Sequence, residues 1–276
     1  MTAPLVISVA PNGARRTQAD HPALPLTPAE LAEAAAACLD AGAAMIHLHV
    51  RDEAGRHVLD PIGYAEAITA IRRRVGDRLV IQITTEAVGR YSAEEQMALV
   101  RTVRPEAVSL ALAEIVPDTD AEPRAAAFLD RLASNGTQAQ YILYTAADVH
   151  RFHDLRTRGV IPDAGHGVLF VLGRYAGERG GEPRELVDFL TEHDRSTPWA
   201  VCAFGPREHA CAVAAAALDG HVRVGFENNL RLRDGRTAPD NAALVAQVRE
   251  AAATLGRPLA TADDLRAGLI GDDSVV

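Results

Sequence analysis

The chain has 276 residues, of which 48% are hydrophobic, and a formal net charge of -9 at pH 7. This length and composition suit one large domain with a sizeable core. The negative charge disfavours a nucleic acid partner, because nucleic-acid-binding proteins usually present a net basic face. All 28 cationic residues are arginine. Without lysine the chain cannot form a Schiff base, an internal pyridoxal phosphate aldimine or a P-loop phosphate site.

The sequence contains no run of about 18 uncharged apolar residues, which a membrane-spanning helix needs. Its first residues also lack the basic and apolar regions of a signal peptide. We therefore expect a cytoplasmic protein with no membrane partner. Three widely spaced cysteines, Cys38, Cys202 and Cys211, fit buried reduced thiols better than disulfides or a thiolate metal site.

Short β-branched runs alternate with alanine-rich helical segments along the whole chain. The candidate strands are Leu5–Ala10, Met45–Val50, Leu79–Thr84, Ala107–Leu112, Gln138–Tyr144, Gly167–Leu172, Trp199–Phe204 and Val222–Glu227. Clear helix patterns are Pro28–Ala41 after Thr27, Pro61–Val75 after Asp60, Ala93–Val103 after Ser92, and Pro239–Leu255. Proline is favoured at a first helical position because its missing N–H would be unpaired there anyway. Strands that alternate with helices indicate a parallel sheet.

Eight strand and helix units within roughly 250 residues favour a closed (β/α)₈ TIM barrel of the α/β class over an open sheet. The first turn, Ala10–Ala14, also lacks the glycine pattern of a dinucleotide-binding fold. We expect one barrel domain over residues 1–276, with a short C-terminal extension from Gly268. Catalytic groups in a barrel lie at the carboxyl ends of the strands. The polar groups expected there are Asn12, Arg15, His47, His49, Thr84, Thr85, Glu86, Ser109, Tyr144, Gly173, Arg174, Gly205, Glu227 and Asn228.

Two histidines, His47 and His49, occupy alternate positions at the end of an apolar run. Alternate side chains on a strand share a face, and neutral imidazole is a common zinc ligand. Glu227, at the end of the eighth candidate strand, is a natural third ligand for a catalytic site with an open position. The alternatives are two hydrogen-bonded histidines in a polar crevice, and a carboxylate that pairs with an arginine.

The remaining histidines lack a partner at ligand spacing, and we expect them on the surface or in packing contacts. They are His57, His150, His153, His166, His193 and His209. His221 precedes the eighth candidate strand at its amino end, away from the expected mouth of the barrel, and is assigned no role.

Several segments resemble the β-keto acid cleavage enzymes, whose best-known member is 3-keto-5-aminohexanoate cleavage enzyme. The most specific are HLHVRD at residues 47–52 and GHVRVGFE at residues 220–227, and weaker similarity runs nearly end to end. The resemblance implies a zinc-dependent retro-Claisen condensation of a β-keto acid with acetyl-CoA, which gives acetoacetate and a new acyl-CoA. It implies zinc ligation by His47, His49 and Glu227, binding of the substrate carboxylate by Arg223, and a homotetramer.

The chain departs from the family pattern at several positions of the expected site. Asn228 stands where the family has an aspartate thought to act as base, and an amide cannot take up a proton at neutral pH. Arg15 stands where the best-known member has a glutamate that contacts the amine of its substrate, and segment 139–142 has lost the acids of the family pattern. We therefore expect a β-keto acid without an amino group. The candidate substrate-binding residues are Arg15, Thr84, Thr85, Ser109 and Arg223.

Two of these departures leave alternatives open. Glu86 lies where the family has glycine and is a candidate replacement base, or it forms a structural salt bridge. Arg15 and its neighbour Arg16 suit a second carboxylate or the phosphates of CoA, or they are solvated surface residues.

Two other functions fit the same residues. The first is a zinc-dependent hydrolase on a barrel scaffold, with a zinc-bound water as nucleophile. Against it, His-x-His barrels of the amidohydrolase type carry the pair on the first strand and often use a modified lysine, which this chain lacks. The second is a catalytically weakened protein that binds metal and a keto acid. Asn228 supports this hypothesis, because its amide replaces the family's aspartate base.

Overall fold

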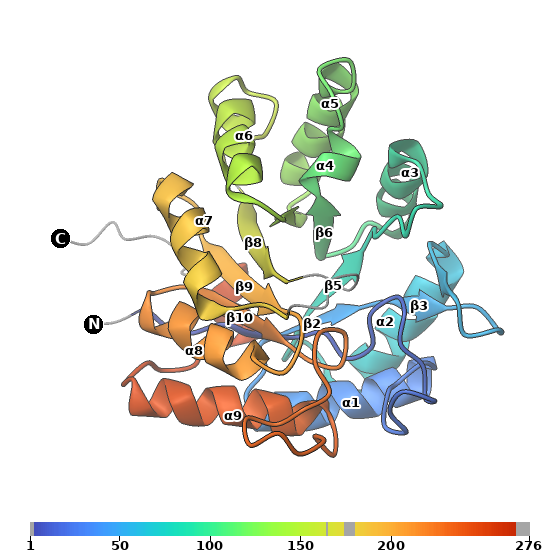
Figure 1. Cartoon of the computed structure of the whole chain (residues 1–276). Coiled ribbons are helices and arrows are strands. Elements are labelled where there is room, and N and C mark those ends of the chain that lie inside the picture. The colour runs from blue at the N-terminus through green and yellow to red at the C-terminus, as the bar shows by residue number, and fades with distance from the viewer. Residues whose placement is uncertain (1–2, 164, 174–179, 269–276) are drawn as a thin grey trace.

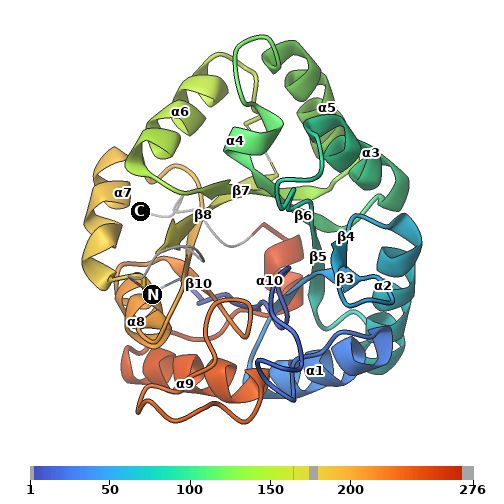
Figure 2. The ribbon, with the colours of Figure 1, turned by 45° about the vertical axis from the view of Figure 1, so that its right-hand side comes forward.

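The computed structural model describes residues 3–163, 165–173 and 180–268. Eight parallel strands close into a barrel in the order β1-β10-β9-β8-β7-β6-β5-β2, and helices surround it (Figures 1 and 2). The strands are β1 (Ile7–Val9), β2 (Met45–Leu48), β5 (Val80–Thr84), β6 (Ala107–Ala111), β7 (Gln138–Leu143), β8 (His166–Leu172), β9 (Trp199–Ala203) and β10 (His221–Val224). The predicted (β/α)₈ barrel is therefore confirmed. The predicted extension beyond Gly268 lies outside the described residues.

The helices follow the sequence patterns closely. They are α1 (Pro28–Ala41), α2 (Pro61–Val75), α3 (Ala93–Val103), α4 (Leu112–Ile115), α5 (Glu122–Ser134), α6 (Ala146–Thr157), η1 (Pro183–Glu185), α7 (Leu186–Glu192), α8 (Glu208–Ala217), α9 (Asn241–Thr254) and α10 (Ala262–Arg266). Thr27 and Ser92 cap α1 and α3 through reciprocal hydrogen bonds with the third helical residue. The expectation that Pro239 begins a helix is wrong. Asp240 is the N-cap of α9, because its carboxylate accepts the N–H of Ala243.

Two strand ends differ from the prediction, and both concern the expected site. β2 ends at Leu48 and β10 ends at Val224, so His49 and Glu227 lie just beyond the strands rather than on them. At His49 the side chain of Asn12 interrupts the strand pairing. Its Nδ2 donates to the carbonyl of His49 at 2.9 Å, and its Oδ1 accepts the N–H of His49 at 3.3 Å.

A short antiparallel pair, β3 (Val50–Arg51) and β4 (His57–Val58), was not expected from the sequence. The chain reverses between them because Asp52 accepts the N–H groups of Ala54 and Arg56. The hairpin lies at the carboxyl end of β2, beside the predicted metal ligands. Its return strand brings His57 against His49, with ring centroids 4.9 Å apart.

The main core fills the space between the strands and the surrounding helices. A smaller apolar cluster contains Leu169 and Val171 of β8 and Phe204, which follows β9. All three cysteines are free and buried, as expected. Among the described residues, no helix has the length and apolar character required to cross a membrane.

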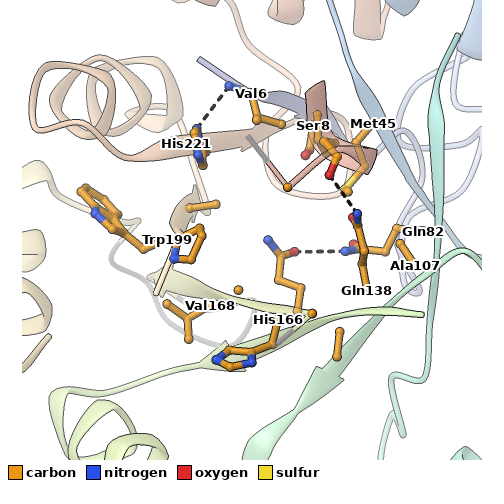
Figure 3. Close-up of a pocket in the computed structure, with 18 of the residues that line it drawn as sticks. Val6, Ser8, Met45, Gln82, Ala107, Gln138, His166, Val168, Trp199 and His221 are labelled. Carbon is orange, nitrogen blue, oxygen red and sulfur yellow. Dashed lines mark hydrogen bonds between the residues drawn. The ribbon is translucent and has the colours of Figure 1, made fainter. Parts of the chain in front are cut away.

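The amino end of the barrel encloses a cavity of about 540 Å³. The lining includes the small residues Ser8, Ala107 and Gly167. Gln82 also lines this cavity, near Ala107 and Gln138 (Figure 3). His221 lines the same cavity and accepts the N–H of Val6 at 3.2 Å. This histidine lies, as expected, at the end of the barrel opposite the predicted metal ligands.

Candidate functional site

Three predicted metal ligands meet at the carboxyl end of the barrel. The Nε2 atoms of His47 and His49 lie 3.2 Å apart, and each is 3.5 Å from Oε2 of Glu227. All three residues are buried, and their ligand atoms form a group that could hold a metal ion. His47 lies on β2 and His49 just after it, whereas Glu227 lies in the turn that follows β10. Strands β2 and β10 both flank β1 in the closed barrel.

The hydrogen bonding of His47 suits metal ligation. Its Nδ1 lies 2.8 Å from Oε1 of Gln82, a carbonyl oxygen that can only accept, so Nδ1 carries the proton and the lone pair is on Nε2. Burial, with the nearby charge of Arg223, lowers the pKa of His47 to about 3. The ring is therefore neutral at pH 7, which is the form that binds a metal.

Glu227 contacts both kinds of partner considered from the sequence, an arginine and the two candidate metal-binding histidines. Its Oε1 accepts a hydrogen bond from Nη2 of Arg223 at 3.1 Å, whereas Oε2 faces the two histidines. Burial alone raises the pKa of Glu227, but the charges of Arg223 and His47 outweigh it and hold that pKa well below its usual range. The carboxylate is thus ionised, with one oxygen on the arginine and one beside the imidazoles.

A tight turn, Gly225–Asn229, presents Glu227. Gly225 has a φ of +142°, and a Cβ atom there would lie 2.3 Å from the carbonyl oxygen of Ala10, so only glycine fits. The N–H of Glu227 donates to the same carbonyl at 3.1 Å. Asn241, at the start of α9, accepts the N–H of Phe226 at 2.8 Å.

Glu208 is the residue of the site that the sequence analysis missed most completely. Its two carboxylate oxygens accept the N–H of Gly225 at 3.0 Å and Nδ2 of Asn229 at 3.1 Å. It is 2% exposed, and burial raises its pKa to about 8. No local signal marks it, because its role depends on the first turn of α8 lying against a turn from another part of the chain.

Asn228 is fully buried in the same turn. Neither polar atom of its side chain makes a hydrogen bond with the described residues. Its carbonyl accepts the N–H of Gly205 at 3.1 Å. Arg16 donates to the carbonyls of Phe226 and Asn228. The sequence suggests that Arg16 binds a second carboxylate or the phosphates of CoA, or that it is a solvated surface residue. Neither interpretation includes the observed contacts, through which Arg16 stabilises the turn that carries Glu227.

The predicted substrate-binding residues lie on neighbouring elements. Thr84 and Ser109, at the end of β5 and on β6, are buried with their hydroxyls 3.5 Å apart, and Thr85 donates to the carbonyl of Ser109 at 3.3 Å. Arg15 is exposed on the segment that follows β1. Arg174, also expected at the mouth, lies outside the described residues.

Glu86 lies on the same side of the site as the two histidines. One carboxylate oxygen is 3.8 Å from Nδ1 of His49, and the side chain is 23% exposed. Burial raises the pKa of Glu86, although the charge of His49 opposes the shift. His57 packs against His49 and its Nε2 lies 3.1 Å from the carbonyl oxygen of Glu86. This contact agrees with its expected packing role.

These observations define a barrel enzyme with a candidate metal centre of two histidines and a glutamate at the carboxyl ends of the strands. The family model of the beta-keto acid cleavage enzymes matches residues 4–270, and the chain belongs to that family, a family of acyl-transferring enzymes. The resemblance found in the sequence is therefore confirmed.

Similar proteins cover almost the whole chain. The 3-oxoadipate:acetyl-CoA acetyltransferase of Cupriavidus necator is 30% identical over 277 residues, which is 97% of this chain and 95% of the relative. The 3-keto-5-aminohexanoate cleavage enzyme of Fusobacterium nucleatum is 30% identical over 269 residues, 95% of this chain and 96% of the relative. The 3,5-dioxohexanoate:acetyl-CoA acetone transferase of Paraburkholderia graminis is 26% identical over 297 residues, 95% of this chain and 94% of the relative.

Solved structures support the fold. ObcA in binary complex with oxaloacetate matches with a TM-score of 0.71 at 19% identity, over 91% of this chain and 67% of that protein. A 3-hexulose-6-phosphate synthase matches with a TM-score of 0.55 at 14% identity, over 90% of this chain and 99% of that one. At these identities the likeness concerns the barrel alone.

Proposed function

We propose that the protein catalyses the zinc-dependent cleavage of a β-keto acid by retro-Claisen condensation with acetyl-CoA. The bond between the α-carbon and the β-carbonyl carbon breaks, and the carboxymethyl unit gains the acetyl group to give acetoacetate. The remaining acyl group passes to the sulfur of CoA. The single observation that carries the proposal is the convergence of His47, His49 and Glu227 within 3.5 Å beside Arg223.

The donor atoms fit zinc. Two imidazole nitrogens and a carboxylate oxygen form a ligand set of known catalytic zinc sites, which keep a further position open. The proton on Nδ1 of His47, which Gln82 fixes, and the ionised state of Glu227 give both residues their ligating forms. When bound, zinc supplies a Lewis acid for the ketone oxygen of the substrate.

Arg223 is proposed to bind the carboxylate of the β-keto acid. Its guanidinium is 4% exposed and lies beside the candidate metal ligands, to which it is tied through Glu227. A planar guanidinium can hold a carboxylate with two parallel hydrogen bonds. This placement would orient the β-ketone toward the ligand atoms and position the bond to be broken.

Glu86 is the proposed proton carrier. Asn228 cannot take up a proton, whereas Glu86 carries a carboxylate oxygen 3.8 Å from Nδ1 of His49. Burial raises its pKa, which brings the carboxyl closer to the range suited to general acid–base catalysis. The partly exposed side chain would exchange protons with solvent.

The substrate class is inferred from two departures from the family pattern. Segment 139–142 carries no acid, and Arg15 stands on the segment after β1. We therefore propose a β-keto acid without an amino group, with Thr84, Thr85 and Ser109 among the substrate-binding residues. A second carboxylate, as the name 3-oxoadipate implies for one relative, would suit Arg15. The proposal includes a homotetramer, which rests on the family resemblance, and a cytoplasmic location, which rests on the expectation from the sequence.

The decisive experiment is a screen of β-keto acids, 3-oxoadipate included, with zinc-loaded protein and acetyl-CoA. Acetoacetate and the new CoA thioester should form in equal amounts, and both should depend on zinc and on acetyl-CoA. Turnover of a keto acid without CoA would favour a hydrolase instead. Measurable keto acid binding with no turnover across the panel would favour the weakened binding protein that the buried amide of Asn228 leaves open.

A further inference from the structure

A second cluster of ligating side chains lies at the opposite end of the barrel. His153 on α6 meets His193 and Asp194, which follow α7 and precede β9, and one ligand atom from each lies within 4.8 Å of the others. We propose that these three residues form a second site for a divalent transition metal of the zinc type, separate from the catalytic centre. The site would join α6 to the segment that leads into β9.

His193 is the strongest part of the cluster. It is 5% exposed, and its Nε2 lies 2.9 Å from the carbonyl oxygen of Thr197. A carbonyl oxygen only accepts, so the proton is on Nε2 and the lone pair is on Nδ1. This Nδ1 is buried and makes no hydrogen bond with the described residues. A ring nitrogen with a fixed lone pair and a backbone carbonyl behind it is the usual arrangement of a metal-binding histidine.

His153 and Asp194 supply the other two ligands. Nδ1 of His153 is 3.3 Å from Oδ2 of Asp194, which matches the separation of neighbouring ligands around a tetrahedral ion with bonds of about 2.0–2.2 Å. Ser196 donates two hydrogen bonds to Oδ1 of Asp194, at 2.7 and 2.9 Å, and so turns Oδ2 toward the histidine. The N–H of Asp194 donates to Nε2 of His153 at a long 3.4 Å. Metal ligation through Nδ1 would place the ring proton on Nε2, so this hydrogen bond would be lost.

The surroundings restrict the kind of ion. Nη1 of Arg156 lies 3.8 Å from Oδ2 of Asp194, and this positive charge opposes a weakly bound cation. Two imidazoles and one carboxylate favour zinc, nickel or copper over magnesium and calcium, which prefer oxygen ligands. Burial lowers the pKa of both His153 and His193, so both rings are neutral at pH 7 and able to bind. The partly exposed His153 and Asp194 leave water as the fourth ligand.

This site does not depend on the proposed reaction. Its residues lie at the amino end of the strands, whereas the catalytic ligands lie at the carboxyl end. We expect the ion to stabilise the packing of α6 against the segment before β9, because a ligand that binds only the folded chain raises its stability.

Metal stoichiometry tests the proposal directly. Protein stripped with a chelator is titrated with Zn²⁺ and Co²⁺ and the bound metal is counted. We expect two equivalents per wild-type chain and one equivalent in both Asp194→Asn and His153→Gln, with the catalytic equivalent retained. His150→Gln removes an exposed histidine one turn earlier on α6 and should keep both equivalents. Circular dichroism verifies that each variant is folded.

The outcomes separate this site from the catalytic one. A wild-type chain that binds no metal, or a single equivalent that Asp194→Asn leaves unchanged, overturns the second site. Two equivalents that survive in both Asp194→Asn and His153→Gln also overturn it. The Glu227→Gln variant should lose the other equivalent, which identifies the catalytic centre as its site. If that loss is seen but the wild-type protein turns over no keto acid, the catalytic centre binds metal and the proposed reaction is wrong.

Discussion

The Nδ1 atom of His47 lies 2.8 Å from the Oε1 atom of Gln82. Gln82 in turn donates from Nε2 to Oε1 of Gln140 at 3.3 Å, so the orientation of the imidazole is coupled to a chain of amides inside the barrel. The amide oxygen fixes the proton on Nδ1 and leaves Nε2 for a metal. Metal affinity should therefore depend on a residue that never touches the ion.

Gln82→Ala should weaken metal binding by about 10- to 100-fold, the usual effect of removing such a supporting hydrogen bond. The affinity is measured by competition with a chelator of known strength. Gln138→Ala is the matched control. Gln138 lines the same cavity but donates to the carbonyl of Leu265, so its loss should leave the affinity unchanged (Figure 3). Equal affinities in Gln82→Ala and wild type would contradict the role of Gln82.

Glu208 should make stability depend on pH. Its folded pKa of about 8 lies above the ordinary 4.5, so the folded chain holds this proton over a range in which the unfolded chain has lost it. The free energy of unfolding should therefore fall as pH rises from about 4.5 to 8, by at most ~1.4 kcal/mol per pH unit from this group. Urea unfolding at several pH values measures the slope.

The Glu208→Gln variant should lose this part of the slope, because an amide does not titrate. The exposed Glu192→Gln variant should keep it. Identical slopes in Glu208→Gln and wild type would show that the buried carboxyl does not hold its proton. The substituted amide also has one oxygen in place of two, so it cannot keep the hydrogen bonds from both Gly225 and Asn229. A weaker metal affinity is therefore expected in Glu208→Gln, through the turn that carries Glu227.

Arg223→Lys should lower kcat/KM about 10-fold or more, although the positive charge is kept. A hydrogen bond between charged groups contributes roughly 1.5–3 kcal/mol, and an ammonium cannot reproduce the planar fork of a guanidinium. Steady-state kinetics with the best β-keto acid measures the loss. Arg207→Lys, at an exposed ion pair with Glu182, is the control and should be neutral. Unchanged kinetics in Arg223→Lys would refute its role in carboxylate binding.

The fold could be predicted where local signals agree. Thr27 and Ser92 cap their helices as the sequence indicates, and eight apolar runs become the eight barrel strands. The ends of β2 and β10 could not be predicted. They depend on the side chain of Asn12, which pairs with His49, and on the close approach of Gly225 to the carbonyl of Ala10.

Some residues of the candidate site could likewise be predicted from local signals, and others could not. His47, His49 and Glu227 could be found because ligand spacing and a family motif mark them in the sequence. Glu208 and Gln82 could not, because a buried carboxylate or amide acquires its role only from partners that the closed barrel brings to it. Their contacts join elements distant in the chain, and no local pattern records such pairs.

Two hypotheses for the acid–base group make different predictions: the amide of Asn228 leaves the family's base missing, or Glu86 has taken over its role. Asn228 is buried with no side-chain hydrogen bond among the described residues, and Glu86 lies 3.8 Å from His49. If a weakened base limits the reaction, Asn228→Asp should raise kcat on simple β-keto acids by about 10²- to 10⁴-fold, the usual contribution of general-base catalysis. A new carboxylate next to Glu227 would also be costly to ionise, so the gain should appear only toward higher pH.

If Glu86 carries the proton, the outcome is reversed. Glu86→Gln should abolish turnover while zinc affinity stays close to that of the wild type, because its nearest oxygen faces Nδ1 of His49 and not the Nε2 that faces Glu227. Asn228→Asp should then change kcat little. Activity of both variants is measured from pH 5 to 9 by acetoacetate formation. Should neither substitution alter a CoA-dependent reaction, neither residue is the base, and the proton must pass through another group of the site.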